Sequence, residues 1–81
     1  MHQESLESTM NSTIQAAIAC AQACRVCASA CLNEKEIDML RECIRLNLDC
    51  AEICDLSAAY MTRESIFHAR LCELCAEVCE A

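Results

Sequence analysis

Apolar residues recur at intervals of three, four and seven along most of this chain, the spacing that places side chains on one face of an α-helix. Charged residues take the opposite positions, most clearly between residues 41 and 55. The pattern predicts three helices, over about residues 4–32, 35–61 and 64–80. Short connections make consecutive helices antiparallel, so we expect an all-α bundle that forms a single helical domain over residues 1–81.

Polar residues mark the expected helix ends. Asn33 suits the left-handed position that often follows a helix, and Thr62 or Ser65 can cap the third helix. With turns near residues 34 and 63, antiparallel pairing places Cys24 close to Cys43, and Cys54 level with Cys72. The same register gathers three donors at one end of the bundle: Met10, Met61 and His68.

Ten cysteines occupy this helical pattern in three clusters. They are Cys20, Cys24, Cys27 and Cys31, then Cys43, Cys50 and Cys54, and finally Cys72, Cys75 and Cys79. Every interval within a cluster is three, four or seven residues, so each cluster lies on one stripe of its helix. We therefore expect the ten thiols to face one shared interior.

The spacing within the clusters favours a metal over a disulfide. Four pairs have C-x3-C spacing, which places their Cβ atoms about 5 to 6 Å apart on a helix, whereas a disulfide needs roughly 3.5 to 4.5 Å. Two metal–sulfur bonds of about 2.3 Å match the wider separation better. A nearly all-sulfur interior suits several Cu(I) ions, with Zn(II) second. Met61 and His68 are additional candidate ligands.

Composition narrows the possible functions. The chain has no Gly, Pro or Trp, so phosphate-cradling loops and dinucleotide fingerprints are excluded. A net charge of −7 with only six basic residues argues against nucleic-acid binding. No nucleophile with a positioned base and no paired carboxylates are evident, so we expect no catalytic residues and no enzyme. The amino terminus lacks the features of a signal peptide, and no apolar run approaches a membrane span, which predicts a cytoplasmic protein without membrane contact.

Three alternatives remain open for the cysteines. One is simple packing, because a free cysteine is a small buried hydrophobe. The second is a disulfide-stapled helical interaction module, in which bridges cross between antiparallel helices. The third is a zinc or mixed soft-metal thiolate protein with a metallothionein-like role.

Three stretches resemble the cysteine-rich, four-helix-bundle copper storage proteins. They are Cys20–Leu32, Cys43–Cys54 continuing to Ala59 and Met61, and Leu71–Cys79. The resemblance implies that the ten cysteines bind Cu(I) inside the bundle, for storage or sequestration, with Met61 and His68 near the mouth through which ions enter. It also implies assembly into oligomers, in a family with exported and cytosolic branches. Because the amino terminus lacks the features of a signal peptide, we expect this chain to resemble the cytosolic branch.

The family usually continues past the position of Ala81 with more cysteines and another helix. Three helices alone leave the interior that the thiols share partly uncovered. They also leave uncovered a second apolar stripe on the third helix, formed by Phe67, Leu71, Leu74 and Val78. We therefore expect subunits to pair and close the core as a homo-oligomer.

Overall fold

The computed structural model describes residues 2–81, with side chains described from residue 10 onward. Its elements are α1 (His2–Leu32), the 3-10 helix η1 (Ile37–Leu40), α2 (Arg41–Thr62) and α3 (His68–Glu80). No strand occurs in this part of the chain, and the three α-helices pack against one another. The predicted all-α fold is confirmed.

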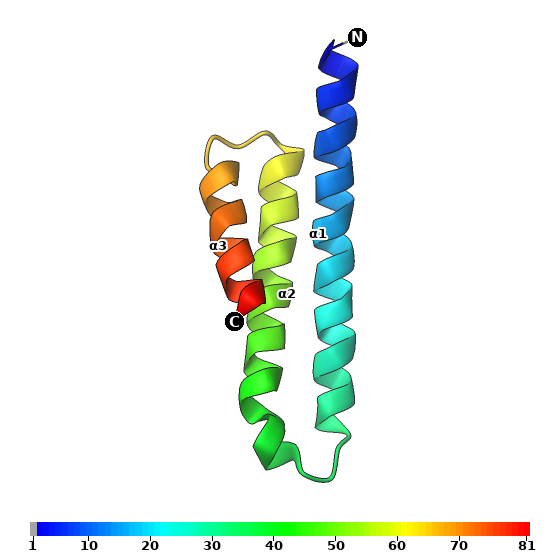
Figure 1. The fold of residues 1–81 in the computed structure, drawn as a ribbon, viewed down its shortest axis with the longest axis vertical. Helices are drawn as coiled ribbons and strands as arrows, with labels where there is room; N and C mark the ends of the chain where they lie inside the picture. Colours follow the sequence, from blue (N-terminus) through cyan, green and yellow to red (C-terminus); the bar gives the residue numbers. More distant parts are fainter. Residues whose placement is uncertain (1) are drawn as a thin grey trace.

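The three α-helices lie side by side, with α2 between α1 and α3 (Figure 1). Helix α1 has 31 residues and, at 1.5 Å per residue, spans about 46 Å, which accounts for most of the 54 Å length of the molecule. Helix α2 returns antiparallel to α1, and α3 runs back along α2 as far as its middle (Figure 1). The molecule is therefore a narrow rod, only 19 by 17 Å across.

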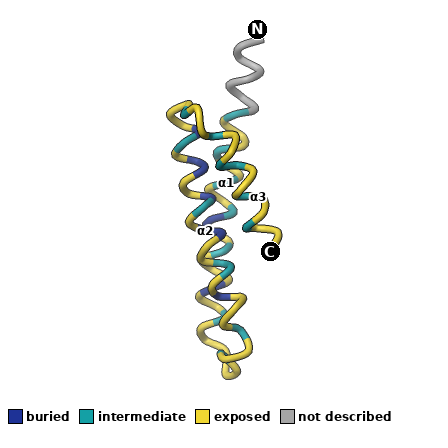
Figure 2. The backbone as a smooth tube through the Cα atoms, turned by 90° about the vertical axis from the view of Figure 1, so that its left-hand side faces the viewer, coloured by how far each residue is buried: buried dark blue, intermediate teal, exposed yellow. Residues whose placement is uncertain are grey.

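Small side chains form the core between these helices. Ala21 and Ala28 of α1 and Ala51 and Ala58 of α2 are all buried, and Figure 2 shows the buried positions following the inner side of the rod. Because alanine has no side chain beyond Cβ, the helix backbones can approach closely where it lies. The close approach brings the cysteines on either side of these alanines into contact range.

Many larger apolar side chains stay on the surface. Those more than half exposed are Val26, Leu32, Met39, Ile66 and Phe67. The stripe expected on the third helix is divided, because Val78 packs against the core cluster while Leu74 remains exposed.

A residue with left-handed backbone conformation follows α2, whereas the sequence predicted one at Asn33, after the first helix. Glu64 has φ 54°, and it is the only residue with positive φ in the described chain. The backbone N–H of Ser65 donates to the Tyr60 carbonyl at 2.9 Å, and that of Glu64 donates to the Met61 carbonyl at 3.1 Å, which together form a Schellman motif. The prediction for Asn33 was wrong, since α1 ends instead in bonds of the 3-10 type.

The second and third helices begin later than predicted. The chain first makes the 3-10 turn η1, closed by a bond from Arg41 Nε to Asp38 Oδ1 at 2.9 Å, so α2 starts at Arg41 and not near residue 35. Helix α3 starts at His68 and not near residue 64, because the Ser65 hydroxyl accepts the Phe67 N–H at 3.2 Å and holds residues 65–67 in a turn.

These longer connections shift the register between the helices. Cys27 of α1 lies opposite Asn47 of α2. The neighbour of Cys43 on α1 is therefore Cys31, whereas Cys24 was expected. Between α2 and α3, Cys54 meets Cys75 where Cys72 was expected. The helix pairing is as predicted, and the level at which the thiols meet is shifted by about two turns between α1 and α2 and by about one turn between α2 and α3.

Candidate metal centre

Each helix presents its cysteines to a neighbouring helix because the intervals of three and four residues follow the helical period. Burial of the thiols is uneven along the rod. Cys54 is buried at 1% exposure and Cys50 at 5%, both near the middle of α2, whereas Cys27 and Cys43 are exposed. The remaining free cysteines are half-buried: Cys20, Cys24, Cys31, Cys72 and Cys75.

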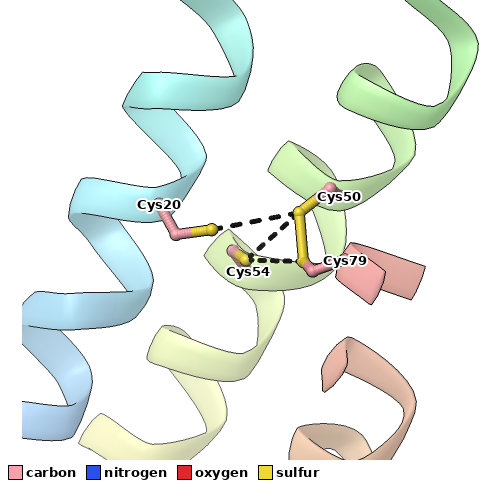
Figure 3. Close-up of side chains that lie close together, drawn as sticks. All are labelled: Cys20, Cys50, Cys54 and Cys79. Carbon is pink, nitrogen blue, oxygen red and sulfur yellow. Dashed lines mark hydrogen bonds between the residues drawn. A yellow bond between two sulfur atoms is a disulfide. The ribbon is translucent and has the colours of Figure 1, made fainter. Parts of the chain in front are cut away.

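Four sulfur atoms from three helices gather at the centre of the rod. The Sγ atoms of Cys20, Cys50, Cys54 and Cys79 all lie within 4.8 Å of one another (Figure 3). Cys50 Sγ lies 3.9 Å from both Cys20 Sγ and Cys54 Sγ, and Cys54 Sγ lies 3.6 Å from Cys79 Sγ. These separations are on the order of those that two metal–sulfur bonds of about 2.3 Å would span. We call these residues the four-sulfur group.

Two members of the four-sulfur group are joined by a disulfide. Cys50 of α2 and Cys79 of α3 form the bond, with their Cα atoms 5.1 Å apart (Figure 3). The remaining cysteines are free, eight in number. The spacing argument against disulfides concerned C-x3-C pairs on one helix, whereas this bridge crosses between antiparallel helices, as the disulfide-stapled alternative expected. A disulfide sulfur is not a thiolate, so all four sulfurs can serve as thiolate ligands only after the bond is reduced.

The buried thiols are held in their protonated form. Burial raises the pKa of Cys54 well above its ordinary value, and hydrogen bonding to Cys75 and Cys20 adds to the shift. Burial likewise raises the pKa of Cys24, with the neighbouring Cys20 contributing, and the pKa of Cys72, with Cys75 contributing. A metal that binds these sulfurs must displace their protons.

A second group of thiols lies near the connection between α1 and η1. Burial raises the pKa of Cys31, and the nearby Cys43 and Cys27 raise it further. The amide Nδ2 of Asn47 donates to Cys27 Sγ at 3.2 Å and to Cys43 Sγ at 3.5 Å. We call Cys27, Cys31 and Cys43 the loop-end thiols. Sequence reasoning missed Asn47, although its place four residues after Cys43 on the thiol stripe was a usable signal.

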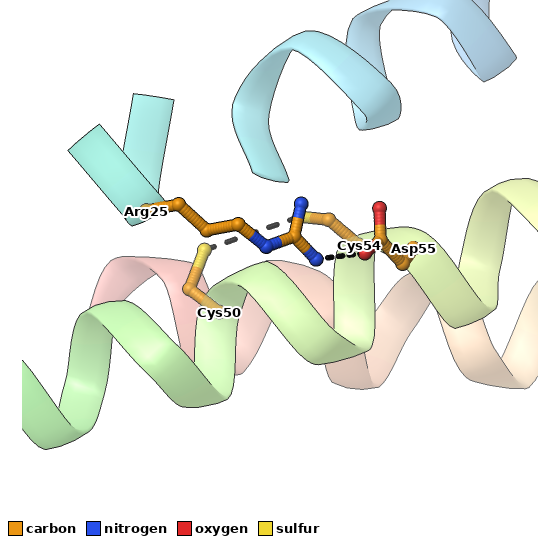
Figure 4. Close-up of polar contacts among 4 residues, drawn as sticks. All are labelled: Arg25, Cys50, Cys54 and Asp55. Atoms are coloured by element: carbon orange, nitrogen blue, oxygen red, sulfur yellow. Dashed lines mark hydrogen bonds and ion pairs between the residues drawn. The ribbon is translucent and has the colours of Figure 1, made fainter. Parts of the chain in front are cut away.

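An ion pair bridges α1 and α2 beside the four-sulfur group. The guanidinium of Arg25 contacts the carboxylate of Asp55, and Figure 4 shows the Arg25 side chain reaching across to Asp55, the residue that follows Cys54 in α2. Both side chains are about half exposed. The pair therefore connects α1 to α2 near the height where the sulfurs meet.

The two candidate ligands other than cysteine lie at the end of the bundle where α2 passes to α3. Met61 is buried at 3% exposure, and His68 is the half-buried first residue of α3. Neither belongs to the four-sulfur group, so their role as ligands stays a prediction.

One segment of α1 is long and apolar enough to cross a membrane by length and composition. It is Met10–Leu32, 23 residues with a mean hydropathy of 1.3. By this measure the expectation that no apolar run approaches a span was wrong, because alanine and cysteine outweigh the interrupting polar residues. A single helix of this kind is weak evidence for a membrane span, since core helices of soluble proteins pass the same test.

Comparisons with known proteins agree with this geometry. The family model for copper storage proteins matches residues 6–81. The uncharacterized cysteine-rich protein YhjQ of Bacillus subtilis (strain 168) is 41% identical over 76 residues, which cover 94% of this chain and 70% of the Bacillus protein. No solved structure matches the chain.

Proposed function

This chain belongs to the copper storage protein family, and from that premise we propose that it binds several Cu(I) ions through its cysteine thiolates and stores them inside the bundle. The observation that carries the proposal is the four-sulfur group, in which three helices contribute sulfurs to one point of the interior. Thiolates are soft ligands and select Cu(I) over harder ions. The family stores metal and is not a family of enzymes, so we propose no catalytic role.

All ten cysteines are proposed ligands. Cys54 and Cys75, with sulfurs 3.3 Å apart, extend the four-sulfur group along α3. Cys24 neighbours Cys20, and Cys72 neighbours Cys75, so both lie beside this cluster. The loop-end thiols extend the column toward η1. Met61 and His68 are proposed as ligands at the opposite end.

The proposal concerns the reduced chain. Reducing Cys50–Cys79 with two equivalents of a thiol yields two cysteine thiols and one external disulfide. A cytoplasmic location, which we also propose, keeps thiols in that state. We further propose a homo-oligomer, supported by the large apolar side chains that the three helices leave exposed.

Storage follows from the arrangement of the ligands. Ions held by buried sulfurs such as Cys54 are shielded from other thiols and from oxidants. Binding also adds to the stability of the fold, because the sulfurs converge only when the three helices are packed.

An anaerobic Cu(I) titration of the reduced chain against a competing chelator tests the proposal. We expect tight uptake of several Cu(I) ions per chain and weaker uptake of Zn(II), which is measured in parallel. Saturation at one ion, or a preference for Zn(II), would contradict storage. The second outcome would favour the zinc alternative, because four sulfurs within 4.8 Å also suit a tetrahedral zinc site.

Ligand substitution assigns the sites. Replacing Cys20 and Cys54 by Ser removes two thiols of the four-sulfur group and should lower the number of bound Cu(I) ions. The matched control is Ser29→Ala with Ser57→Ala, which alters the same two helices without removing a thiol. Equal capacity in the cysteine variant and the control would exclude the four-sulfur group as a copper site.

A further inference from the structure

Asn47 links two thiols from different helices. Its amide nitrogen donates to Cys27 Sγ on α1 and to Cys43 Sγ on α2, at 3.2 and 3.5 Å. An amide carries two N–H donors, so one side chain can serve both sulfurs. The sulfur atoms of the two exposed cysteines are thus held close together, although neither is fixed by core packing.

Cys31 completes a three-thiol cluster at this position. Its thiol is close enough to Cys27 and Cys43 for both to raise its pKa. Exposure distinguishes the cluster from the centre of the rod, because Cys27 and Cys43 are exposed while Cys54 is 1% exposed. An ion bound by the loop-end thiols would therefore be within reach of molecules in solution.

A cavity opens onto two of these thiols. Its volume is about 870 Å³, and its lining includes Cys27, Cys31 and Met39. Met39 is 80% exposed, so it fills no gap in the core, which is the usual reason for a methionine in a helical protein. The backbone N–H of Met39 donates to the Glu36 carbonyl at 3.1 Å within the turn that leads into η1. The cavity thus has two thiols and one thioether in its wall.

We propose that the loop-end thiols and Met39 form the site where Cu(I) is exchanged with a small thiol from solution, and that Asn47 positions Cys27 and Cys43 for this exchange. The inference rests on the proposed function and places the exchange of copper at the end of the bundle opposite to Met61 and His68, where the family resemblance had placed the mouth. A cavity of this volume suits a small molecule, since ligand sites commonly measure about 300 to 1,000 Å³.

The exchange is a ligand substitution without redox change. The sulfur of the incoming thiol forms a bond to Cu(I), the bond from Cu(I) to a cysteine sulfur breaks, and the thiol proton passes to that cysteine. Copper remains Cu(I) throughout. Met39 can hold the ion while it passes from the cysteine sulfur to the sulfur of the incoming thiol, because a thioether binds Cu(I) without having to lose a proton.

Transfer kinetics test this assignment. The reduced, Cu(I)-loaded chain is mixed anaerobically with bicinchoninate, with and without glutathione, and the rate of chelator binding and the total copper released are recorded. We expect Met39→Leu and Asn47→Ala each to slow transfer at least threefold, with total copper changed by no more than one ion. Asn47→Asp separates hydrogen bonding from shape, since it has nearly the same shape but no N–H to donate. It should be as slow as Asn47→Ala.

Two further comparisons make the result decisive. Asn11→Ala, a matched change at an exposed position of α1, should transfer copper at the wild-type rate. His68→Ala and Met61→Leu examine the opposite end of the bundle. If they slow transfer more than Met39→Leu does, or if Asn47→Asp behaves like wild type, the inference is overturned while storage stands. A wild-type chain that binds one Cu(I) or none would overturn the proposed function itself.

Discussion

The Sγ atom of Cys54 in α2 lies 3.3 Å from the Sγ atom of Cys75 in α3. Cys54 also lies within 4 Å of both Cys50 and Cys79, and it is among the most fully buried side chains of the described chain. Helix α3 therefore meets α2 largely through sulfur. Cys54 is thus part of the apolar core of the metal-free chain and is also a proposed metal ligand.

Replacing Cys54 by Ala should destabilise the metal-free protein. The substitution deletes a buried sulfur and leaves a small void, so we expect the free energy of unfolding to fall by about 1 to 2 kcal/mol. Urea unfolding followed by circular dichroism measures the change. The control is Cys27→Ala at an exposed position, where the expected change is within about 0.5 kcal/mol. Equal losses at the two sites would mean that Cys54 makes no special packing contribution.

Reducing the Cys50–Cys79 bond should loosen α3 in the metal-free chain. The bond closes a loop with a sequence separation of 29 residues. By the chain-entropy relation, such a loop corresponds to about 3 to 4 kcal/mol of stability. We expect treatment with a phosphine to lower the unfolding free energy by up to this amount and to raise the count of reactive thiols in denaturant from eight to ten.

Adding Cu(I) to the reduced chain should reverse this loss, because the metal then joins the same helices. A Cys79→Ser variant is the control, since it lacks the bond before reduction and should not respond to phosphine. If reduction leaves the stability of the wild-type chain unchanged, the bond does not hold α3 against α2.

The helices and the stripe that the thiols of each helix share could be predicted from intervals of three, four and seven, because the helical period alone determines which residues share a face. The expectation that all ten thiols face the interior was wrong for Cys27, Cys43 and Cys79, which are exposed. The register between neighbouring helices could not be predicted in this way. It depends on how many residues the connections consume, and η1 and the turn at residues 65–67 arise from bonds such as Asp38–Arg41 and Ser65–Phe67 that periodicity does not reveal.

The composition of the site was predicted better than its grouping. The ten cysteines were identified as one set, yet the structure separates the four-sulfur group, in which Cys50 and Cys54 are buried, from the loop-end thiols, of which Cys27 and Cys43 are exposed. Asn47 was not identified, although it lies four residues after Cys43 on the thiol stripe, because its hydrogen bond to Cys27 can be recognised only once the opposing helix is placed. The disulfide depends on the same placement, since Cys50 and Cys79 meet only at the observed level of α3.

The stability of the metal-free chain should fall at alkaline pH. Burial raises the pKa of Cys24, Cys54 and Cys72 above the ordinary value of 9.0. The folded chain therefore keeps these protons at pH values where the unfolded chain has lost them. Their contribution to stability is complete below pH 9 and declines as the pH rises above 9 toward the folded pKa values.

Urea unfolding at half-unit steps from pH 8 to 11, without reductant, measures this slope. Other groups titrate in the same range, so the informative quantity is the difference between wild type and Cys54→Ala. We expect a shallower decline in the variant. Parallel curves would indicate that the Cys54 thiol has the same pKa in the folded and unfolded chains.

The ion pair between Arg25 and Asp55 should contribute little energy despite its position across α1 and α2 (Figure 4). Because both side chains are about half exposed, water screens the pair, and we expect a coupling free energy of about 0.2 to 1 kcal/mol. A double-mutant cycle with Arg25→Ala and Asp55→Ala measures it. In 1 M salt, where charges are screened within about 3 Å, the coupling should shrink further.

The same cycle at Asp38 and Arg41, which are more exposed and lie within one turn, should give the smaller value. A coupling above about 2 kcal/mol for Arg25 and Asp55 would mean that this pair, and not the alanine and cysteine packing beneath it, determines the level at which α1 meets α2.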